Sequence, residues 1–330
     1  MLKTICTMLT GGLLIYCFSV RTFGSEIKKT ETKTFEMTPG GYISVEGDEG
    51  FIRVSSWDKS KVYLVMTRRA WGRSKQEAER LLEKIDVRIN NFNNRLEIKL
   101  VKLKEGKDFS FWDLLDPDNW GKNGRSATVD FELTVPKEIN LNLLNDEGDV
   151  EVKSVSGDVE IHVDEGNIQI MDIELSVMNL YMDEGDINGA NLNNPNGHIT
   201  VEVDEGDITL ADVNVKRLKT NSDEGDINIK KLTCQSCNIS TDEGDVELEI
   251  SPAENERYHI STDEGILIFY LPHSPDIRLD LEVEDGRIKS EYNISITQRN
   301  GSQRCRDKLG NGSSFLEASA DEGTIFLRKQ

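Results

Sequence analysis

Basic residues are scarce in this chain of 330 residues. It has 39 lysines and arginines against 60 aspartates and glutamates, which gives a formal net charge of −21. Nucleic-acid binding needs a basic footprint and adsorption to anionic lipid needs positive charge, so this balance argues against both. The natural complement of such a chain is a cation or a basic partner.

Aromatic residues make up only 7% of the chain, and there are four histidines. The histidines, His162, His198, His259 and His273, are scattered, and the sequence has neither a Gly-x-Ser-x-Gly motif nor a phosphate-binding loop. We therefore expect a protein that is not an enzyme and that has no certain cofactor. A β-helical polysaccharide lyase is the remote enzymatic alternative, and it would need an arginine or lysine beside the acidic turns described below.

Long hydrophobic runs are also missing, with one exception from about Ile5 to Val20, followed by small residues around Gly24. A basic residue, an apolar stretch and small residues in this order predict a signal peptide over residues 1–24, with an uncleaved membrane anchor as the alternative. We expect an exported protein, periplasmic, at the cell surface or secreted, with no transmembrane segment beyond the N-terminal signal.

Cysteine is rare, and three cysteines follow the signal segment: Cys234, Cys237 and Cys305. Export permits a disulfide, either within the Cys-Gln-Ser-Cys stretch or from this stretch to Cys305. Zinc binding or thioredoxin-like chemistry would need further ligands or a βαβ setting, and the sequence shows neither. Buried free thiols are the remaining interpretation, and the three alternatives stay open at this point.

One triplet, by contrast, is abundant. Asp-Glu-Gly occurs at 48–50, 146–148, 164–166, 183–185, 204–206, 223–225, 242–244, 263–265 and 321–323, and Glu-Asp-Gly occurs at 284–286. Apolar residues alternate with polar ones on both sides of the triplets, as at Val201 and Val203 before Gly206 and at Ile208 and Leu210 after it. A period of two on both sides predicts a strand, a turn and a second strand.

The spacing of the triplets predicts how these strands are assembled. The glycines from Gly148 to Gly286 are 18 to 21 residues apart. This interval predicts an all-β fold, a β-solenoid (β-helix) with two strands and two turns per coil, whose consecutive coils pair like strands. Gly157 and Gly197 mark the opposite turn of the coil. A meander of β-hairpins is the alternative.

The acidic turns have a structural and a functional interpretation. Glycine suits a backbone with positive φ and aspartate hydrogen-bonds local backbone, so Asp-Glu-Gly-Asp is competent turn chemistry. Stacked coils would repeat the carboxylates about every 4.8 Å. We expect solvated turn acids. Calcium ions that bridge the coils are the alternative, although the Gly-Gly-x-Gly-x-Asp pattern of calcium-binding β-rolls is absent. The calcium candidates are Asp146, Asp164, Asp183, Asp204, Asp223, Asp242 and Asp263.

The chain outside the triplets suggests three further regions. Residues 25–136 hold a first coil and an N-terminal capping region, in which residues 74–85 have the spacing of a short amphipathic helix with Ser74 as its N-cap. This helix could cover an open end of the solenoid. Residues 137–330 hold the acidic-turn repeats, and a basic, glycine-rich loop at 297–314 either neutralises nearby carboxylates or binds a ligand.

An aromatic insertion at 104–127 interrupts two strand-like runs. Its aromatic side chains either contact a partner or pack on the flank of the solenoid. These candidate contact residues are Phe109, Phe111, Trp112 and Trp120.

Several motifs together resemble a known family. They are the opening F-E-M-T-P-G-G-Y-I-S-V and G-F-I-R-V-S-S-W-D, the early helix, V-D-F-E-L-T-V-P, the repeated Gly-Asp-Val and Gly-Asp-Ile strands, and the closing G-T-I-F-L-R-K. The chain resembles the bacterial β-strand-repeat domains of unknown function whose members are often labelled as adhesins. The resemblance implies an exported or envelope-associated β-solenoid without established enzymatic activity, and it supplies no binding residues.

The chain departs from the commoner Ser-Gly-Asp turn of that family by inserting Asp-Glu. Together these observations predict a non-enzymatic scaffold of the cell envelope or secreted medium, adhesin-like, which presents a rigid acidic edge to a protein or glycan partner.

Overall fold

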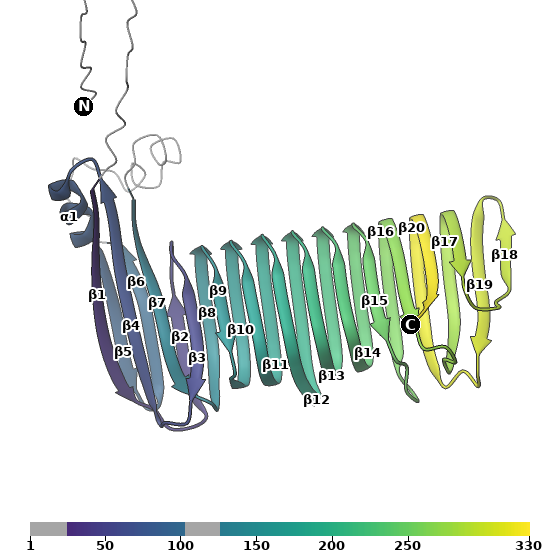
Figure 1. Ribbon diagram of the computed structural model, residues 1–330, viewed down its shortest axis with the longest axis horizontal. Helices are drawn as coiled ribbons and strands as arrows, with labels where there is room; N and C mark the ends of the chain where they lie inside the picture. The colour runs from purple at the N-terminus through teal and green to yellow at the C-terminus, as the bar shows by residue number, and fades with distance from the viewer. Residues whose placement is uncertain (1–24, 103–125) are drawn as a thin grey trace, which may run out of the picture. The chain divides into compact units, whose positions relative to one another are not determined.

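The computed structural model describes residues 25–102 and 126–330 (Figure 1). The predicted signal peptide at 1–24 and the aromatic residues Phe109, Phe111, Trp112 and Trp120 lie outside these ranges. The chain divides into two compact units. Of the described residues, the smaller unit contains 25–30, 67–86, 101–102 and 126–128, and the larger unit contains 31–66, 87–100 and 129–330.

The smaller unit carries α1 (Lys75–Glu83), the only helix in the described part of the chain. Ser74 caps it, because the Oγ of Ser74 accepts a hydrogen bond from the backbone N–H of Glu77 at 3.3 Å. The Glu77 carboxylate in turn accepts one from the N–H of Arg73 at 2.8 Å. The helix expected at 74–85 is therefore confirmed, with slightly shorter bounds. What the helix covers stays a prediction.

Strands make up most of both units. Five strands have residues in both: β1 (Ser25–Glu36), β4 (Lys61–Gly72), β5 (Ile85–Phe92), β6 (Arg95–Lys102) and β7 (Ser126–Pro136). The others belong to the larger unit: β2 (Gly41–Glu46), β3 (Ile52–Trp57), β8 (Ile139–Glu147), β9 (Val150–Lys153), β10 (Ser156–Glu165), β11 (Ile168–Glu184), β12 (Ile187–Glu205), β13 (Ile208–Glu224), β14 (Ile227–Glu243), β15 (Val246–Ile250), β16 (Arg257–Leu271), β17 (Ile277–Ser290), β18 (Ile296–Arg299), β19 (Ser302–Leu309) and β20 (Ser314–Lys329).

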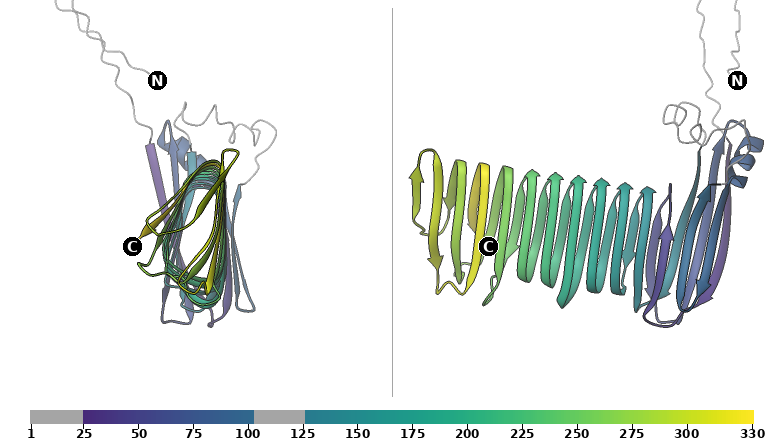
Figure 2. Two further views of the ribbon diagram at one scale, coloured as in Figure 1. Left: turned by 90° about the vertical axis from the view of Figure 1, so that its right-hand side faces the viewer. Right: turned by 180° about the vertical axis from the view of Figure 1, so that it is seen from behind.

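Consecutive coils of the larger unit pair as parallel strands in direct register. Ile187 of β12 pairs with Ile208 of β13, and Ile208 pairs with Ile227 of β14. All three isoleucines are fully buried, so equivalent inward residues stack into apolar columns that form the core. Figure 2 shows these coils from behind and, in its left-hand view, one behind another. The predicted β-solenoid is confirmed.

Each central coil bends at two places besides the Asp-Glu-Gly turn. In β12 the alternation of buried and exposed side chains breaks at Asn191, where φ is 57°, and again at the exposed residues 195–196. In β14 the same breaks occur at Lys231, where φ is 51°, and at residues 235–236. The second break is the turn expected beside Gly197. The first break is not among the predicted turns, although aspartate or asparagine, which tolerate positive φ, stands there in three coils at Asp172, Asn191 and Asp212.

The coils at the C-terminal end do not follow chain order. Gly323 of β20 pairs with Gly265 of β16 on one side and with Gly286 of β17 on the other, so the last strand lies between the two (Figure 1). The expectation that the coil of Gly286 stacks directly on the coil of Gly265 is therefore wrong. A strand edge accepts any segment that satisfies its hydrogen bonds and supplies inward apolar residues, and β20 does both, with Ala318 nearly fully buried.

Most of the region predicted as a basic loop at 297–314 is strand. β19 pairs antiparallel with β17, and β18 pairs antiparallel with β19. Asn300 and Gly301, with φ values of 51° and 95°, supply the left-handed conformations that a two-residue hairpin turn requires. The glycine-rich composition therefore marks the turns of a hairpin that ends the row of parallel coils.

Candidate functional site

The acidic turns of the larger unit lie one above another along one edge of the solenoid. Strand register places their glutamates in a single column that ends at Asp285. In spatial order the column is Glu49, Glu147, Glu165, Glu184, Glu205, Glu224, Glu243, Glu264, Glu322 and Asp285. We call the aspartates and glutamates of these triplets the acidic ladder.

The turns need glycine for two separate reasons, which Gly206 illustrates. Its φ is 143°, a conformation that residues with a side chain rarely adopt. A Cβ at this position would also lie 1.9 Å from the carbonyl oxygen of Gly185 in the preceding coil. On the same side, the N–H of Gly185 donates to the carbonyl of Glu205 at 2.9 Å, so the turn cannot move away from Gly185 without losing a hydrogen bond. Close backbone stacking therefore dictates the glycine column.

The residue after each glycine connects neighbouring coils. The Oδ1 of Asp207 accepts a hydrogen bond from the N–H of Asp226 at 2.9 Å, and the Oδ1 of Asp226 accepts one from Asp245 at 2.8 Å. Asp186 does the same for Asp207 at 3.1 Å, and Asn167 does so for Asp186 at 3.2 Å. These side chains satisfy backbone N–H groups that would otherwise lack a partner at the bend, so they act as turn chemistry.

Short polar side chains beneath the turns hold the carbonyl groups from inside. Thr241 Oγ1 donates to the carbonyl of Gly225 at 3.4 Å, and Thr262 Oγ1 donates to that of Gly244 at 3.3 Å. Neither threonine is among the residues that the sequence patterns single out. The signal that identifies them is a run of hydroxyl residues, Ser222, Thr241 and Thr262, that continues an inward column occupied by Val203 in the preceding coil.

Beyond its first step at Asp48 and Glu49, the acidic ladder exposes its carboxylates to solvent. From Asp164 to Glu264 the aspartate and glutamate of each triplet are exposed, and their side chains form neither a hydrogen bond nor an ion pair with a described residue. Elsewhere on the solenoid, Glu202 pairs with Lys219 at 2.6 Å. Two unit charges about 4.8 Å apart repel by roughly 0.9 kcal/mol in water. From Asp164 to Glu264 the ladder is thus a line of negative charge that the described residues do not neutralise.

The calcium candidates occupy this line at intervals of one coil. Calcium requires six to eight oxygen ligands. Residues 25–102 and 126–330 contain no group of three or more aspartate, glutamate, histidine or cysteine side chains arranged to hold a metal ion. Calcium binding by Asp146, Asp164, Asp183, Asp204, Asp223, Asp242 and Asp263 stays a prediction.

A cavity of about 360 Å³ lies beside the first steps of the ladder, with Phe51, Arg53, Asp149 and Glu151 in its lining. Arg53 Nε lies 2.6 Å from Glu151 Oε2, and the guanidinium lies 4.7 Å from the centre of the Phe51 ring. Hydrogen bonds from Lys153 and Arg53 lower the pKa of Glu151. The polysaccharide-lyase alternative requires a basic residue near the acidic turns. Arg53 has this position, but its guanidinium is ion-paired with Glu151.

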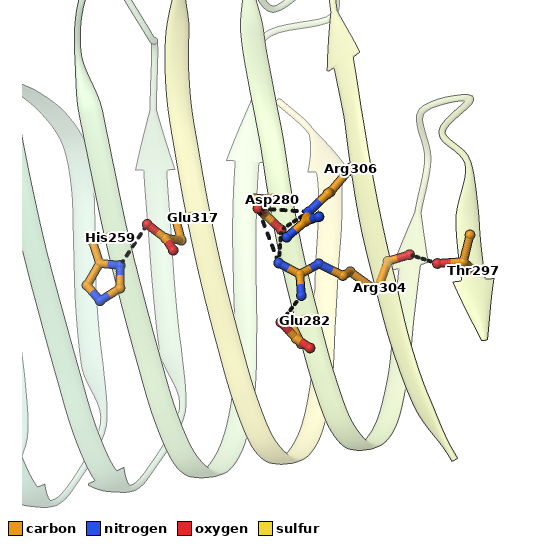
Figure 3. Close-up of polar contacts among 7 residues, drawn as sticks. All are labelled: His259, Asp280, Glu282, Thr297, Arg304, Arg306 and Glu317. Atoms are coloured by element: carbon orange, nitrogen blue, oxygen red, sulfur yellow. Dashed lines mark hydrogen bonds and ion pairs between the residues drawn. The ribbon is translucent and has the colours of Figure 1, made fainter. Parts of the chain in front are cut away.

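The histidines lie on separate coils with separate neighbours. His162 stacks on Tyr181 with 4.4 Å between ring centres, and His198 Nδ1 lies 3.1 Å from Arg217 Nε. Desolvation, together with the positive charge of Arg217, lowers the pKa of His198. His259 lies 3.4 Å from a glutamate of the adjacent strand (Figure 3). The fold therefore does not bring these three histidines into one site.

A second charged cluster holds the C-terminal hairpin against the solenoid (Figure 3). Arg304 forms ion pairs with Asp280 at 3.0 Å and with Glu282 at 2.7 Å, and Arg306 contacts Asp280 at 3.2 Å. On the outer side of β19, Thr297 Oγ1 donates to the carbonyl of Arg304 at 3.0 Å. These two arginines therefore neutralise carboxylates of β17, which is one of the two roles expected for the basic segment.

The family assignment rests on a match over most of the chain. The model of the Toastrack DUF4097 family matches residues 71–328. The chain belongs to this family. The resemblance to a β-strand-repeat domain of unknown function is thus confirmed, and the Toastrack assignment agrees with the solenoid of the larger unit.

Several solved structures are distantly similar to this Toastrack chain. A candidate adhesin of Bacteroides fragilis is 14% identical with a TM-score of 0.38, over 91% of this chain and 97% of the other. A candidate cell adhesion protein of Clostridium sporogenes is 11% identical with a TM-score of 0.24, over 92% and 100%. A candidate lipid-binding protein of Parabacteroides distasonis is 14% identical with a TM-score of 0.29, over 89% and 96%.

No curated protein matches the chain significantly. Among the described residues, no helix is long and apolar enough to cross a membrane.

Proposed function

We propose that this Toastrack chain is a non-enzymatic, exported scaffold of the cell envelope whose acidic ladder binds a cationic protein partner. The observation that carries the proposal is the register of the turns, which stacks exposed carboxylates along one edge of the solenoid. The signal-peptide pattern at 1–24 supports export. The negative net charge supports a basic partner, because complementary charge steers association and sets specificity.

The backbone around the ladder supports a rigid display of these charges. Each turn is held by hydrogen bonds to both neighbouring coils, such as Gly206 N–H to Glu224 O at 2.8 Å and Gly185 N–H to Glu205 O at 2.9 Å. The carboxylates therefore project from anchor points with a fixed spacing. A partner with several cations pays less ordering entropy when the opposing charges are already in place.

The acidic ladder can be tested with an oligolysine peptide as the probe. The peptide carries a fluorophore, and fluorescence anisotropy measures its binding to the full chain at increasing salt. One variant replaces ladder acids of three adjacent coils by their amides: Asp183→Asn, Glu184→Gln, Asp204→Asn, Glu205→Gln, Asp223→Asn and Glu224→Gln. The matched control changes net charge equally on other surfaces: Glu160→Gln, Glu174→Gln, Glu247→Gln, Glu249→Gln, Glu254→Gln and Glu317→Gln.

We expect the ladder variant to lose affinity and the control to retain most of it. Exposed ion pairs contribute about 0.2–1 kcal/mol each, so removal of six carboxylates should weaken binding roughly tenfold or more. Equal losses in the two variants would mean that net charge, and not the ladder, attracts the peptide. That result would contradict the proposal.

Two further measurements separate the alternatives. Calorimetric titration with calcium, with magnesium as the comparison, tests whether the ladder is instead a calcium site, and saturable calcium-specific heat that the ladder variant loses would favour that assignment. Incubation with polygalacturonate tests the lyase alternative. Release of unsaturated products that stops in Arg53→Met would overturn the non-enzymatic assignment.

A further inference from the structure

Two cysteines share the inner side of one bend of β14. Cys234 and Cys237 are 1% and 2% exposed, whereas the intervening residues Gln235 and Ser236 are exposed. The exposed pair forms the break in the alternation, so the side chains on either side of it both point inward from the same corner. This geometry brings side chains three positions apart in sequence towards each other.

The adjacent coil shows what these positions normally hold. Register pairs Val215 with Cys234 and Leu218 with Cys237, and both aliphatic residues are buried. The cysteines therefore replace two core aliphatics in this coil. Since two aliphatic side chains already fill the corner in β13, the cysteine pair is not required by the fold.

The two thiols are close enough to interact directly. A hydrogen bond with Cys234, together with burial, raises the pKa of Cys237 well above its ordinary value. Only the thiolate attacks a disulfide. In the folded protein the buried thiols of Cys234 and Cys237 therefore do not react with oxidants in solution. Oxidation has to take place while this coil is open, during folding or transient unfolding.

The third cysteine is too distant to compete. Cys305 is a buried free thiol in β19, and strands β16, β20 and β17 lie between β14 and β19. Four strand spacings amount to about 19 Å, whereas the Cα atoms of a disulfide lie within about 7 Å of each other. The predicted alternative of a bridge from the Cys-Gln-Ser-Cys stretch to Cys305 is therefore wrong for this fold.

We propose that Cys234 and Cys237 form a dithiol–disulfide pair that closes into an intracoil disulfide when the chain folds in the presence of a disulfide oxidant. The thiolate of one cysteine attacks the oxidant's disulfide and gives a mixed disulfide. The second thiolate then displaces the oxidant's remaining thiolate and forms the Cys234–Cys237 bond. The two cysteines lose two electrons and two protons, and the oxidant leaves as two thiols. The proposal stands independently of the acidic ladder.

The test refolds the full chain from denaturant in a buffer of reduced and oxidised glutathione, with dithiothreitol as the reduced reference. Iodoacetamide in denaturant then traps free thiols, and tryptic peptides are analysed by mass spectrometry. Cleavage after Lys231 and Arg257 gives a peptide, residues 232–257, that contains both cysteines, whereas Cys305 falls in a separate peptide.

In the glutathione sample we expect neither cysteine of peptide 232–257 to be alkylated, and the peptide to be two hydrogen atoms lighter than its reduced, unalkylated form. Cys305 should be alkylated, and the refolded chain should show the native β spectrum by circular dichroism. Cys305→Ser should leave this result unchanged. Cys234→Ser should leave Cys237 alkylated or joined to glutathione. Alkylation of both cysteines in the refolded wild type would overturn the proposal, as would a disulfide found only in chains that fail to recover the native spectrum.

Discussion

Replacement of Gly206 by alanine tests whether close backbone stacking holds the acidic ladder together. The substitution adds a Cβ 1.9 Å from the carbonyl oxygen of Gly185, at a residue whose φ is 143°. Real Cβ atoms do not approach backbone this closely, so the coil has to shift. The shift away from Gly185 stretches the hydrogen bond from Gly185 N–H to Glu205 O at 2.9 Å.

The cost can be estimated from these two effects. A backbone conformation that disfavours side chains costs about 1–3 kcal/mol, and one lost backbone hydrogen bond costs about 1 kcal/mol net. Gly206→Ala should therefore lower the free energy of unfolding by about 2–4 kcal/mol. Gly40→Ala is the matched control, because Gly40 has a φ of 75° but a Cβ there meets nothing within 4 Å. We expect it to cost only about 1–2 kcal/mol.

Urea unfolding followed by circular dichroism measures both variants. Stacked repeats can unfold in parts, so hydrogen exchange analysed by mass spectrometry should accompany it. The amides of Gly185 and Ile187, which donate to Glu205 O and Asp207 O at 2.9 Å each, report on the affected coils directly. A Gly206→Ala chain with wild-type unfolding and wild-type exchange would refute the stacking argument, and a cost no larger than that of Gly40→Ala would refute the clash.

Three further predictions concern other parts of the solenoid. Asp226→Ala removes the acceptor for the next coil's backbone N–H and should lower the free energy of unfolding in urea by about 1 kcal/mol, whereas Asp223→Ala on the exposed ladder should not; equal effects would contradict the different roles of the two aspartates. Asp280→Asn should speed hydrogen exchange in residues 302–309, as high salt should in the wild type, and unchanged exchange would show that the arginine pairs do not hold the hairpin. Hydrogen bonds from neighbouring lysine and arginine lower the pKa of Glu151 in the folded state. Its contribution to the free energy of unfolding is therefore complete above its pKa in the unfolded chain, and is lost as the pH falls through its pKa in the folded chain. In that pH window the melting temperature of Glu151→Gln should therefore fall less than that of the wild type. An identical fall in both proteins would contradict a stabilising role for the Glu151 carboxylate.

Local signals in the sequence were reliable where one segment decides its own structure. Ser74 and Glu77 identify the start of the helix, because the Ser74 hydroxyl accepts from the Glu77 N–H in the first turn and the Glu77 carboxylate accepts from the N–H of Arg73 just before the cap. The glycine of the triplet identifies the turn, since φ at Gly206 demands it. Periodic apolar residues such as Ile208 identify the inward face of each coil.

Pairings between distant segments were not accessible in the same way. The coil edges of β16 and β17 present the same pattern of backbone groups to any partner, so nothing local reveals that β20 lies between them. The composition of 297–314 predicts turns but not which strand the hairpin joins. The sequence also did not show which acids bond the next coil and which only face solvent, because Asp223 and Asp226 differ only in their position relative to the glycine.

A β-solenoid with acidic glycine turns can be predicted from the amino-acid sequence alone, because strand alternation and turn conformation depend on residues a few positions apart. The folded chain is needed to establish the spatial order of the last coils, the place of Glu322 between Glu264 and Asp285, and the separation of Cys234 and Cys237 from Cys305. These features depend on which strands hydrogen-bond across the solenoid, and chemically equivalent strand edges do not encode that choice locally.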